Sequence, residues 1–218
     1  MKHEDISRII RILKKEYHGW NVPAVTLEAA TTRDPFRVLI STVLSLRTKD
    51  ETTAGASGRL FALADTPEVM LALSEKEIAE AIYPVGFYRT KAKNIRGICR
   101  EIIEKYDSRV PGGLDELLGL KGVGRKTANL VLTLGYGKPG ICVDTHVHRI
   151  SNRLGYVRTR TPYDTEMELR KKLPRRHWID YNSLLVAFGQ YLCRPISPKC
   201  STCPVEAYCD KAGVGKSR

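Results

Sequence analysis

Four cysteines lie close together near the end of the sequence, and thiolates are strong metal ligands. They follow the spacing C-x6-C-x2-C-x5-C, as Cys193, Cys200, Cys203 and Cys209. Four thiols so close together predict a metal site in an intracellular protein, with two disulfides as the least favoured alternative. Zinc sites usually pair two short C-x2-4-C turns, whereas only one such turn is present here. The spacing therefore favours an iron–sulfur cluster over zinc.

A lysine stands directly behind a pair of glycines in the middle of the sequence. Gly122 and Gly124 each allow a tight turn, because glycine adopts positive φ without steric cost. The amides of such a turn, with those that open the next helix, are suited to hold a phosphate oxygen. Lys126 follows in the first turn of that helix, which is predicted from about Arg125 to Leu134. Because a neutral amine attacks carbon, Lys126 is a candidate nucleophile, with a solvated surface charge as the plain alternative.

An acidic residue follows eighteen positions later, in the segment Val143-Asp144-Thr145-His146. Asp144 is predicted to be the N-cap of a helix, which would by itself explain its presence. His146 and His148 lie two apart on this helix and point about 200° away from each other, so they do not predict a shared metal site. Of the two histidines, His146 is the better candidate for contact with a substrate.

The formal net charge of +12 favours a polyanionic partner, and nucleic acid is the commonest one. The alternative is that the charge only keeps the protein in solution. No apolar stretch is long enough to cross a membrane, and the first residues show neither a signal peptide nor a transit peptide. The sequence therefore predicts an intracellular, cytoplasmic protein without a membrane partner.

Helical periodicity dominates the chain and predicts an all-α fold. Ile6, Ile9, Ile10 and Leu13 form one apolar stripe, and Asp34-Pro35 opens a helix that is predicted to extend through Leu46. Ser74 to Glu77 reads as a capping box. Further helices are predicted over residues 91–106 and 180–192. Cys99 and Cys142 lie in apolar helical surroundings and are expected to be packed thiols.

Taken together, these motifs resemble the endonuclease III family of helix-hairpin-helix DNA glycosylases. The resemblance rests on the segment Leu120-Lys121-Gly122-Val123-Gly124-Arg125-Lys126-Thr127-Ala128-Asn129, on Val143-Asp144-Thr145-His146 and on the four-cysteine tail. It extends from about Asp34-Pro35-Phe36 to Cys209 in the family's order and spacing. Each motif alone is only moderately specific, but their joint occurrence is highly specific.

The resemblance implies a two-lobed fold. A six-helix barrel domain would span residues 27–137 and include a helix-hairpin-helix at about 114–135. A discontinuous iron–sulfur domain would combine residues 1–26 with 138–218 and carry a [4Fe-4S] cluster on Cys193, Cys200, Cys203 and Cys209. The protein would act as a monomer on double-stranded DNA that contains a damaged base or an abasic site. In a prokaryote it would be associated with the nucleoid.

The resemblance also assigns the chemistry. Lys126 would attack C1′ of a nucleotide flipped out of the duplex, and Asp144 would stabilise positive charge on the sugar or assist proton transfer. A Schiff base would follow, and β-elimination would cut the strand on the 3′ side. Relatives that only remove the base lack the lysine, so Lys126 indicates a combined glycosylase and lyase acting on oxidised pyrimidines. The alternatives are a mismatch-directed glycosylase and a non-catalytic iron–sulfur module that binds DNA.

Two positions bear on which base the protein would remove. Arg47 stands where bacterial members of the family usually carry a glutamine that fills the gap left by the flipped base. Arginine could stack there and donate to the orphaned base. Phe87 falls where the family places an apolar wedge, with a buried core phenylalanine as the alternative. The full set of expected DNA contacts is Arg47, Phe87, Lys121, Gly122, Val123, Gly124, Arg125, Thr127, Thr145 and His146.

Overall fold

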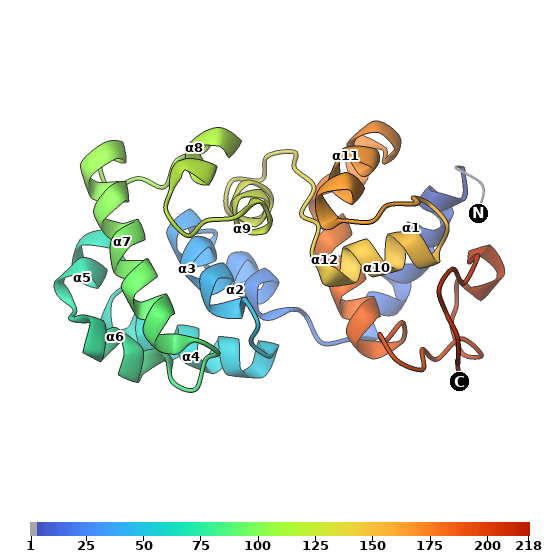
Figure 1. The fold of residues 1–218 in the computed structure, drawn as a ribbon, viewed down its shortest axis with the longest axis horizontal. Helices are drawn as coiled ribbons and strands as arrows, with labels where there is room; N and C mark the ends of the chain where they lie inside the picture. The colour runs from blue at the N-terminus through green and yellow to red at the C-terminus, as the bar shows by residue number, and fades with distance from the viewer. Residues whose placement is uncertain (1–3) are drawn as a thin grey trace. The chain divides into compact units, whose positions relative to one another are not determined.

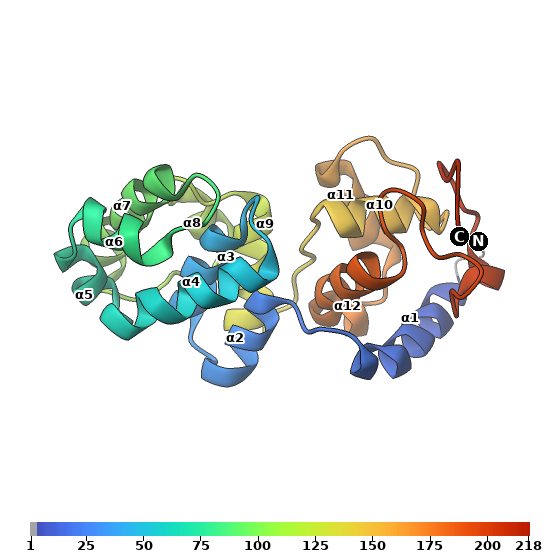
Figure 2. The same cartoon turned by 90° about the horizontal axis from the view of Figure 1, so that it is seen from below.

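The computed structural model of the protein describes residues 4–218, and these form helices and loops without any strand. The all-α prediction is therefore confirmed. The chain divides into two compact units (Figures 1 and 2). The central unit is Ala24–Gly140, and the terminal unit combines the residues up to Pro23 with Ile141–Arg218. Both boundaries of the central unit lie three residues outside the sequence-based limits of 27 and 137.

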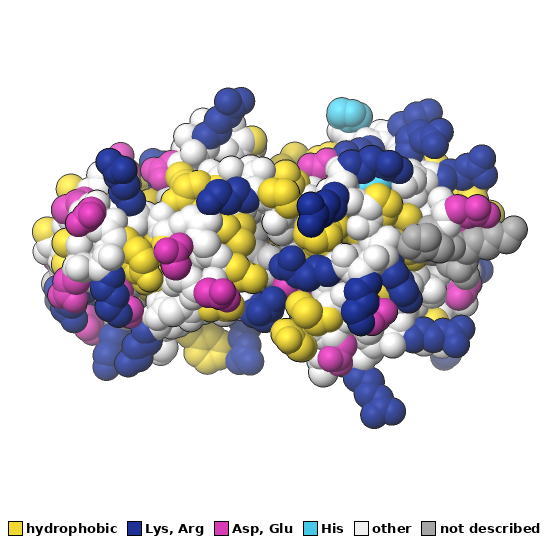
Figure 3. Space-filling model, turned by 90° about the horizontal axis from the view of Figure 1, so that it is seen from above, with side chains coloured by type: hydrophobic (Ala, Val, Ile, Leu, Met, Phe, Trp, Pro, Cys, Tyr) yellow, Lys and Arg dark blue, Asp and Glu magenta, His cyan; other side chains and the backbone are white. Residues whose placement is uncertain are grey.

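The surface of both units is rich in cations. Figure 3 shows lysine and arginine side chains distributed over the visible face of each unit. In the whole sequence 36 lysines and arginines outnumber 24 acidic residues, which gives the net charge of +12. Among the described residues, no helix is both long and apolar enough to cross a membrane.

The central unit is built around α3 (Pro35–Ser45), which contacts α2, α4, α7 and α9. Its residues Val38, Leu39, Ile40 and Leu44 are fully buried. A helix that is apolar on nearly every side is stable only inside a core. The other elements of the unit are α2 (Ala24–Thr32), α4 (Asp50–Leu63), α5 (Pro67–Ala72), α6 (Glu75–Ile82), α7 (Tyr88–Tyr106), α8 (Leu114–Gly119), α9 (Arg125–Leu130) and the π-helical turn η2 (Val131–Gly135).

Capping residues define the helix starts as the sequence predicts. At α3 the Asp34 side chain accepts from the amide of Phe36 at 2.8 Å, and Pro35 occupies the first turn. At α6 the Ser74 side chain accepts from the amide of Glu77, and the Glu77 carboxylate accepts in return from the amide of Ser74. The end of α3 differs slightly from the prediction. The helix stops at Ser45, because Leu46 already has extended backbone geometry.

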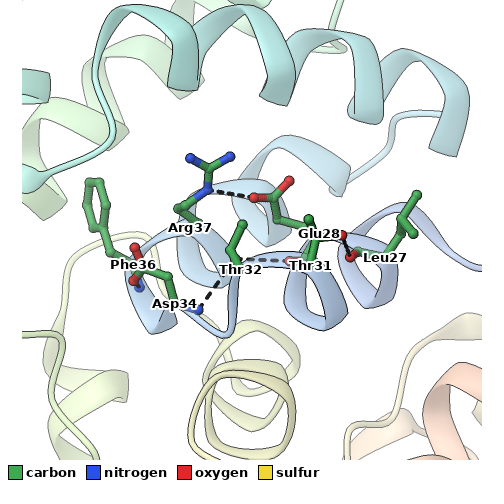
Figure 4. A network of polar contacts seen from close by, with 7 residues as sticks. All are labelled: Leu27, Glu28, Thr31, Thr32, Asp34, Phe36 and Arg37. Atoms are coloured by element: carbon green, nitrogen blue, oxygen red, sulfur yellow. Dashed lines mark hydrogen bonds and ion pairs between the residues drawn. The ribbon is translucent and has the colours of Figure 1, made fainter.

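A polar network joins α2 to the start of α3 (Figure 4). The Arg37 guanidinium donates to the Glu28 carboxylate at 2.7 Å and lies 4.3 Å from the centre of the Phe61 ring on α4. The Thr32 hydroxyl accepts from the amide of Asp34 at 3.4 Å. These contacts hold α2, α3 and α4 together around the first turn of α3. They thereby set the direction of α3, whose other end leads to Arg47.

The terminal unit is built around α12 (Trp178–Tyr191), which packs against α1 (Asp5–Glu16) and α10 (Thr145–Arg153). The predicted apolar stripe of α1 is confirmed, because Ile6, Ile9, Ile10 and Leu13 are all buried. The remaining elements are η1 (Tyr17–Gly19), α11 (Pro162–Lys172), η3 (Arg175–His177) and η4 (Glu206–Tyr208).

Candidate active site and metal centre

The glycine turn lies between α8 and α9, as the sequence predicts, but the two glycines play different parts. Gly122 has φ +90°, which an L side chain rarely adopts. Gly124 has φ −92° and ψ 172°, which is ordinary extended backbone, and it serves as the N-cap of α9. The expectation that both glycines use positive φ is therefore wrong for Gly124. The turn is closed by a hydrogen bond from the amide of Val123 to the carbonyl of Leu120 at 3.0 Å.

The turn is also fixed from α7. The amide of Lys121 donates to the Glu101 carboxylate at 3.2 Å. A hydrogen bond from Lys105 and this amide both hold the pKa of Glu101 below its usual range. The amide of Lys121 is thus already engaged within the protein. Lys121, Gly122 and Gly124 are exposed, whereas the side chains of Val123 and Thr127 are buried.

Lys126 lies in the first turn of α9 and is half-buried. Its charge acts on a second lysine, Lys91 of α7. Burial, followed by the charge of Lys126, lowers the pKa of Lys91 to about 8. Beyond Leu130 the helix continues as the π-helical turn Val131–Gly135, so the predicted helix to Leu134 is helical throughout but not α-helical at its end. π-helical turns are rare in proteins overall, and those that do occur are often found at functional sites.

Arg47 and Phe87 form a pair on the surface of the central unit. Each is a non-glycine residue with positive φ, 53° at Arg47 and 58° at Phe87. The guanidinium of Arg47 lies 5.6 Å from the centre of the Phe87 ring. Phe87 is 62% exposed, so it is not a core residue. The sequence predicted that both residues contact the base stack, but it did not indicate that they lie next to each other.

Asp144 is the N-cap of α10, as predicted. Its Oδ1 atom accepts from the amides of His146 and Val147, both at 2.9 Å. Both bonds end on the same carboxylate oxygen. Asp144 is only half-buried as a residue.

The residues that follow Asp144 point in different directions. Thr145 is exposed. The His146 ring interacts with the Arg149 guanidinium at 3.2 Å, and a side chain added at Gly189 would clash with its Nδ1 atom. His146 is therefore packed against α12, a role that the sequence did not indicate. The His148 ring interacts with the Thr165 hydroxyl at 2.7 Å.

The four clustered cysteines line a single apolar pocket in the terminal unit, at the end of α12. Its other walls include Ile150, Leu154, Phe188 and Val205. Burial first, and then the charges of the other three cysteines, raise the pKa of the Cys203 thiol to about 11. Four half-buried thiols that influence one another electrostatically match a centre ligated by four thiolates. Cys99 and Cys142 are fully buried, as expected for packed thiols.

Two arginines that the sequence did not single out hold the cysteine loop in place. Arg153 is buried, and its guanidinium donates to the carbonyls of Arg194 at 2.6 Å and Pro195 at 2.7 Å. Arg149 donates to the carbonyl of Cys193 at 2.9 Å. The sequence gives only a weak indication of this role, because both arginines lie beside Ile150 on the edge of the apolar stripe of α10.

Within residues 4–218, no group of three or more histidine, cysteine, aspartate or glutamate side chains is arranged to hold a single metal ion. The four thiols that line the pocket are the donor set of a thiolate-ligated centre, either zinc or iron–sulfur.

Comparisons with known proteins agree with this geometry. The family model described as HhH-GPD superfamily base excision DNA repair protein matches residues 40–175. The Endonuclease III of Thermotoga maritima is 50% identical over 188 residues, which cover 85% of this chain and 88% of that protein. A solved structure of a trapped Endonuclease III–DNA covalent intermediate matches with a TM-score of 0.86 and 35% identity over 97% of both chains. A thermostable thymine-DNA glycosylase matches with a TM-score of 0.80 and 26% identity over 94% of this chain and 93% of that chain.

Proposed function

The chain belongs to the HhH-GPD superfamily of base excision DNA repair proteins. We propose the following roles for its residues in the reaction of a DNA glycosylase and AP lyase. Lys126 is the nucleophile and Asp144 its acidic partner. One observation carries the proposal. Lys126 follows directly behind the glycine turn, in a chain similar over nearly its whole length to an Endonuclease III that was trapped in a covalent intermediate with DNA.

The reaction begins when the neutral amine of Lys126 attacks C1′ of the damaged nucleotide. A bond from Nζ to C1′ forms while the bond from C1′ to the base nitrogen breaks, and the base leaves with the bonding electrons. Opening of the sugar ring then gives a Schiff base. Loss of a proton from C2′ expels the 3′ phosphate and cuts the strand. A free hydroxyl nucleophile would remove the base but could not form this intermediate.

Asp144 stabilises the positive charge that develops on the sugar or accepts a proton from the amine. Its cap bonds use Oδ1, so Oδ2 is the oxygen proposed to act. The two cap bonds also fix the carboxylate before the substrate arrives, and a charge held in place in advance stabilises a transition state most effectively.

Damaged double-stranded DNA is the proposed substrate, with oxidised pyrimidines as the lesion class. The exposed residues Lys121, Gly122 and Gly124 grip the phosphate backbone. Val123 and Thr127 contribute through their backbone only, because their side chains are buried. Arg47 and Phe87 enter the base stack, and Arg125 and Thr145 contact phosphates at its edge. His146, which is half-buried against Gly189 of α12, is the remaining proposed DNA contact. The site of action is the cytoplasm, on the nucleoid if the source is a prokaryote.

The four cysteines of the terminal pocket would hold a [4Fe-4S] cluster. Bound there, the cluster would supply a four-thiolate crosslink that keeps the loop from Cys193 to Cys209 folded. Arg149 and Arg153 hold the same loop by its carbonyls, so this part of the chain is supported from two sides. Iron and sulfide analysis of the isolated protein, with absorbance near ~400 nm, checks the assignment. A colourless protein with one zinc ion per chain would overturn it.

A strand-cleavage assay tests the proposed reaction. Wild-type protein is expected to nick a duplex that contains thymine glycol on the 3′ side of the lesion, and Lys126→Gln is expected to lose the nick. Lys121→Gln is the matched control, since it removes a lysine of the same turn. It should weaken DNA binding while still cutting at saturating enzyme. Cleavage by Lys126→Gln at the wild-type rate would disprove the role of Lys126.

The same assay addresses mismatch-directed excision, which Arg47 and the likeness to a thymine-DNA glycosylase keep as a second candidate. A duplex with a guanine–thymine mispair is compared with one that contains thymine glycol. Faster excision from thymine glycol supports oxidised pyrimidines. Faster excision from the mispair would assign the mismatch function instead.

A further inference from the structure

Lys91, in the first turn of α7, is a buried lysine that the proposed reaction does not use. It is 6% exposed. Its ammonium donates to the carbonyls of Leu44 at 2.8 Å and Leu46 at 2.6 Å, and to the hydroxyl of Thr48 at 3.2 Å. A lysine ammonium has three N–H donors, so all three have partners. A cation is costly to bury unless it is satisfied in this way.

The partners of Lys91 all belong to one short segment at the end of α3. The last carbonyls of a helix have no partner within it, and a cation near them is favourable. Leu44 and Leu46 lie on either side of Ser45, where α3 ends. Lys91 therefore supplies hydrogen bonds that the helix cannot, and it ties the end of α3 to the start of α7.

The same segment carries Arg47, and it is joined to the turn that carries Phe87. The Thr48 hydroxyl accepts from Lys91 and also from the amide of Gly86 at 3.2 Å. A Cβ atom at Gly86 would lie 2.7 Å from the carbonyl oxygen of Arg47, so the two turns pack backbone against backbone. Gly86 is the residue that allows this approach.

Arg47 and Phe87 both keep a backbone conformation that is unfavourable for their residue types. Positive φ in a non-glycine residue persists only where the surroundings enforce it. Here the enforcing contacts are Lys91, Thr48 and the close approach at Gly86. Lys91 itself is buried, and its bonds to Leu46 and Thr48 are partly buried.

We propose that Lys91 is a positioning residue that clamps the turn from Leu44 to Thr48, and that it thereby presents Arg47 and Phe87 together to the gap left by a flipped base. The inference rests on the proposed function of that pair. The clamp also lies near the nucleophile, because the charge of Lys126 contributes to the lowered pKa of Lys91.

A double-mutant cycle tests whether Lys91 acts through Arg47. Single-turnover excision is measured for Lys91→Met, Arg47→Ala and the double variant, on lesion duplexes with each of the four opposite bases. Each single variant is expected to slow excision about 10- to 100-fold, as for misplaced contacts near a reacting centre, and to flatten the preference for the opposite base. The double variant should be no worse than the slower single variant, because coupled residues are not additive.

Lys93→Met is the matched control, since Lys93 is an exposed lysine on the same helix. It is expected to keep the wild-type preference for the opposite base. Multiplied losses in the double variant, with Arg47→Ala impaired by itself, would overturn the clamp. Arg47→Ala at the wild-type rate and preference would instead overturn the proposed DNA contact of Arg47.

Amide hydrogen exchange of the protein without DNA measures whether Lys91 holds this turn in place. Lys91→Met should speed exchange at the amides of Thr48 and Gly86, and Lys93→Met should leave it unchanged. Thr48→Val removes only the shared hydroxyl, and it keeps the measurement informative if Lys91→Met fails to fold. Unchanged exchange at Gly86 in Thr48→Val, and in Lys91→Met where it folds, would contradict the clamp.

Discussion

At the scale of single residues, Lys126 and Asp144 each combine a structural place with a chemical task. Asp144 caps α10 through Oδ1, and this bond pattern is sufficient to explain an acidic residue there. Lys126 lies in the first turn of α9, behind a turn that is fixed by Glu101. The local structure around either side chain does not by itself indicate a catalytic role. Substitutions that separate the two tasks are therefore the most informative.

Asp144→Asn separates capping from charge. Asparagine accepts the same two amide bonds and ranks with aspartate as an N-cap, so the free energy of unfolding should change by less than about 0.5 kcal/mol. Excision should slow at least about 100-fold, because the charge that assists proton transfer is lost. Urea denaturation and single-turnover kinetics measure the two effects. Asp144→Ala, as the comparison, should also lose about 1 kcal/mol of stability. Full activity in Asp144→Asn would reduce Asp144 to a cap.

At the scale of elements, the two glycines of the turn, Gly122 and Gly124, have different roles. Gly122 provides the backbone geometry, with φ +90°. At Gly124 an added Cβ atom would meet no atom within 4 Å, so nothing inside the protein requires glycine there. A glycine without an internal reason is consistent with close approach of a ligand to the backbone.

A pair of alanine variants distinguishes these roles. Gly122→Ala should lower the free energy of unfolding by about 1–2 kcal/mol, because a side chain is strained at positive φ. Gly124→Ala should leave stability near the wild-type value but weaken binding to duplex DNA, since its methyl group would face the phosphate. Thermal unfolding and fluorescence anisotropy measure the two properties. Equal stability of both variants would contradict the assignment of backbone strain to Gly122.

At the scale of the whole molecule, local patterns predicted the helices and the motif residues, and long-range contacts supplied the rest. The capping box at Ser74 and the stripe of α1 are visible in the sequence because their partners lie within a few residues. Lys91 is different. Its spacing puts it on the stripe of Ile95, Ile98 and Ile102, yet its partners lie more than forty positions away. Periodicity could indicate that Lys91 is buried, but not what it binds.

The exposure of Phe87 and the packing of His146 have the same origin. Phe87 is exposed because the turn around Gly86 packs on the Arg47 turn. His146 is half-buried because α10 lies against α12. Neither contact leaves a local signal. The candidate nucleophile, its acidic partner and the four cysteines were identified from motif spacing, whereas the residues that support them were found only in the fold.

The central claim is that Lys126 forms the covalent intermediate, and peptide mapping of a trapped adduct tests it most directly. Wild-type protein is incubated with thymine-glycol duplex and borohydride, which reduces a Schiff base to a stable amine, and the digest is analysed by mass spectrometry. We expect the sugar adduct on Nζ of Lys126 and no adduct in Lys126→Gln. An adduct on Lys91, Lys121 or the N-terminal amine of wild-type protein, or none at all while the strand is cut, would contradict the account.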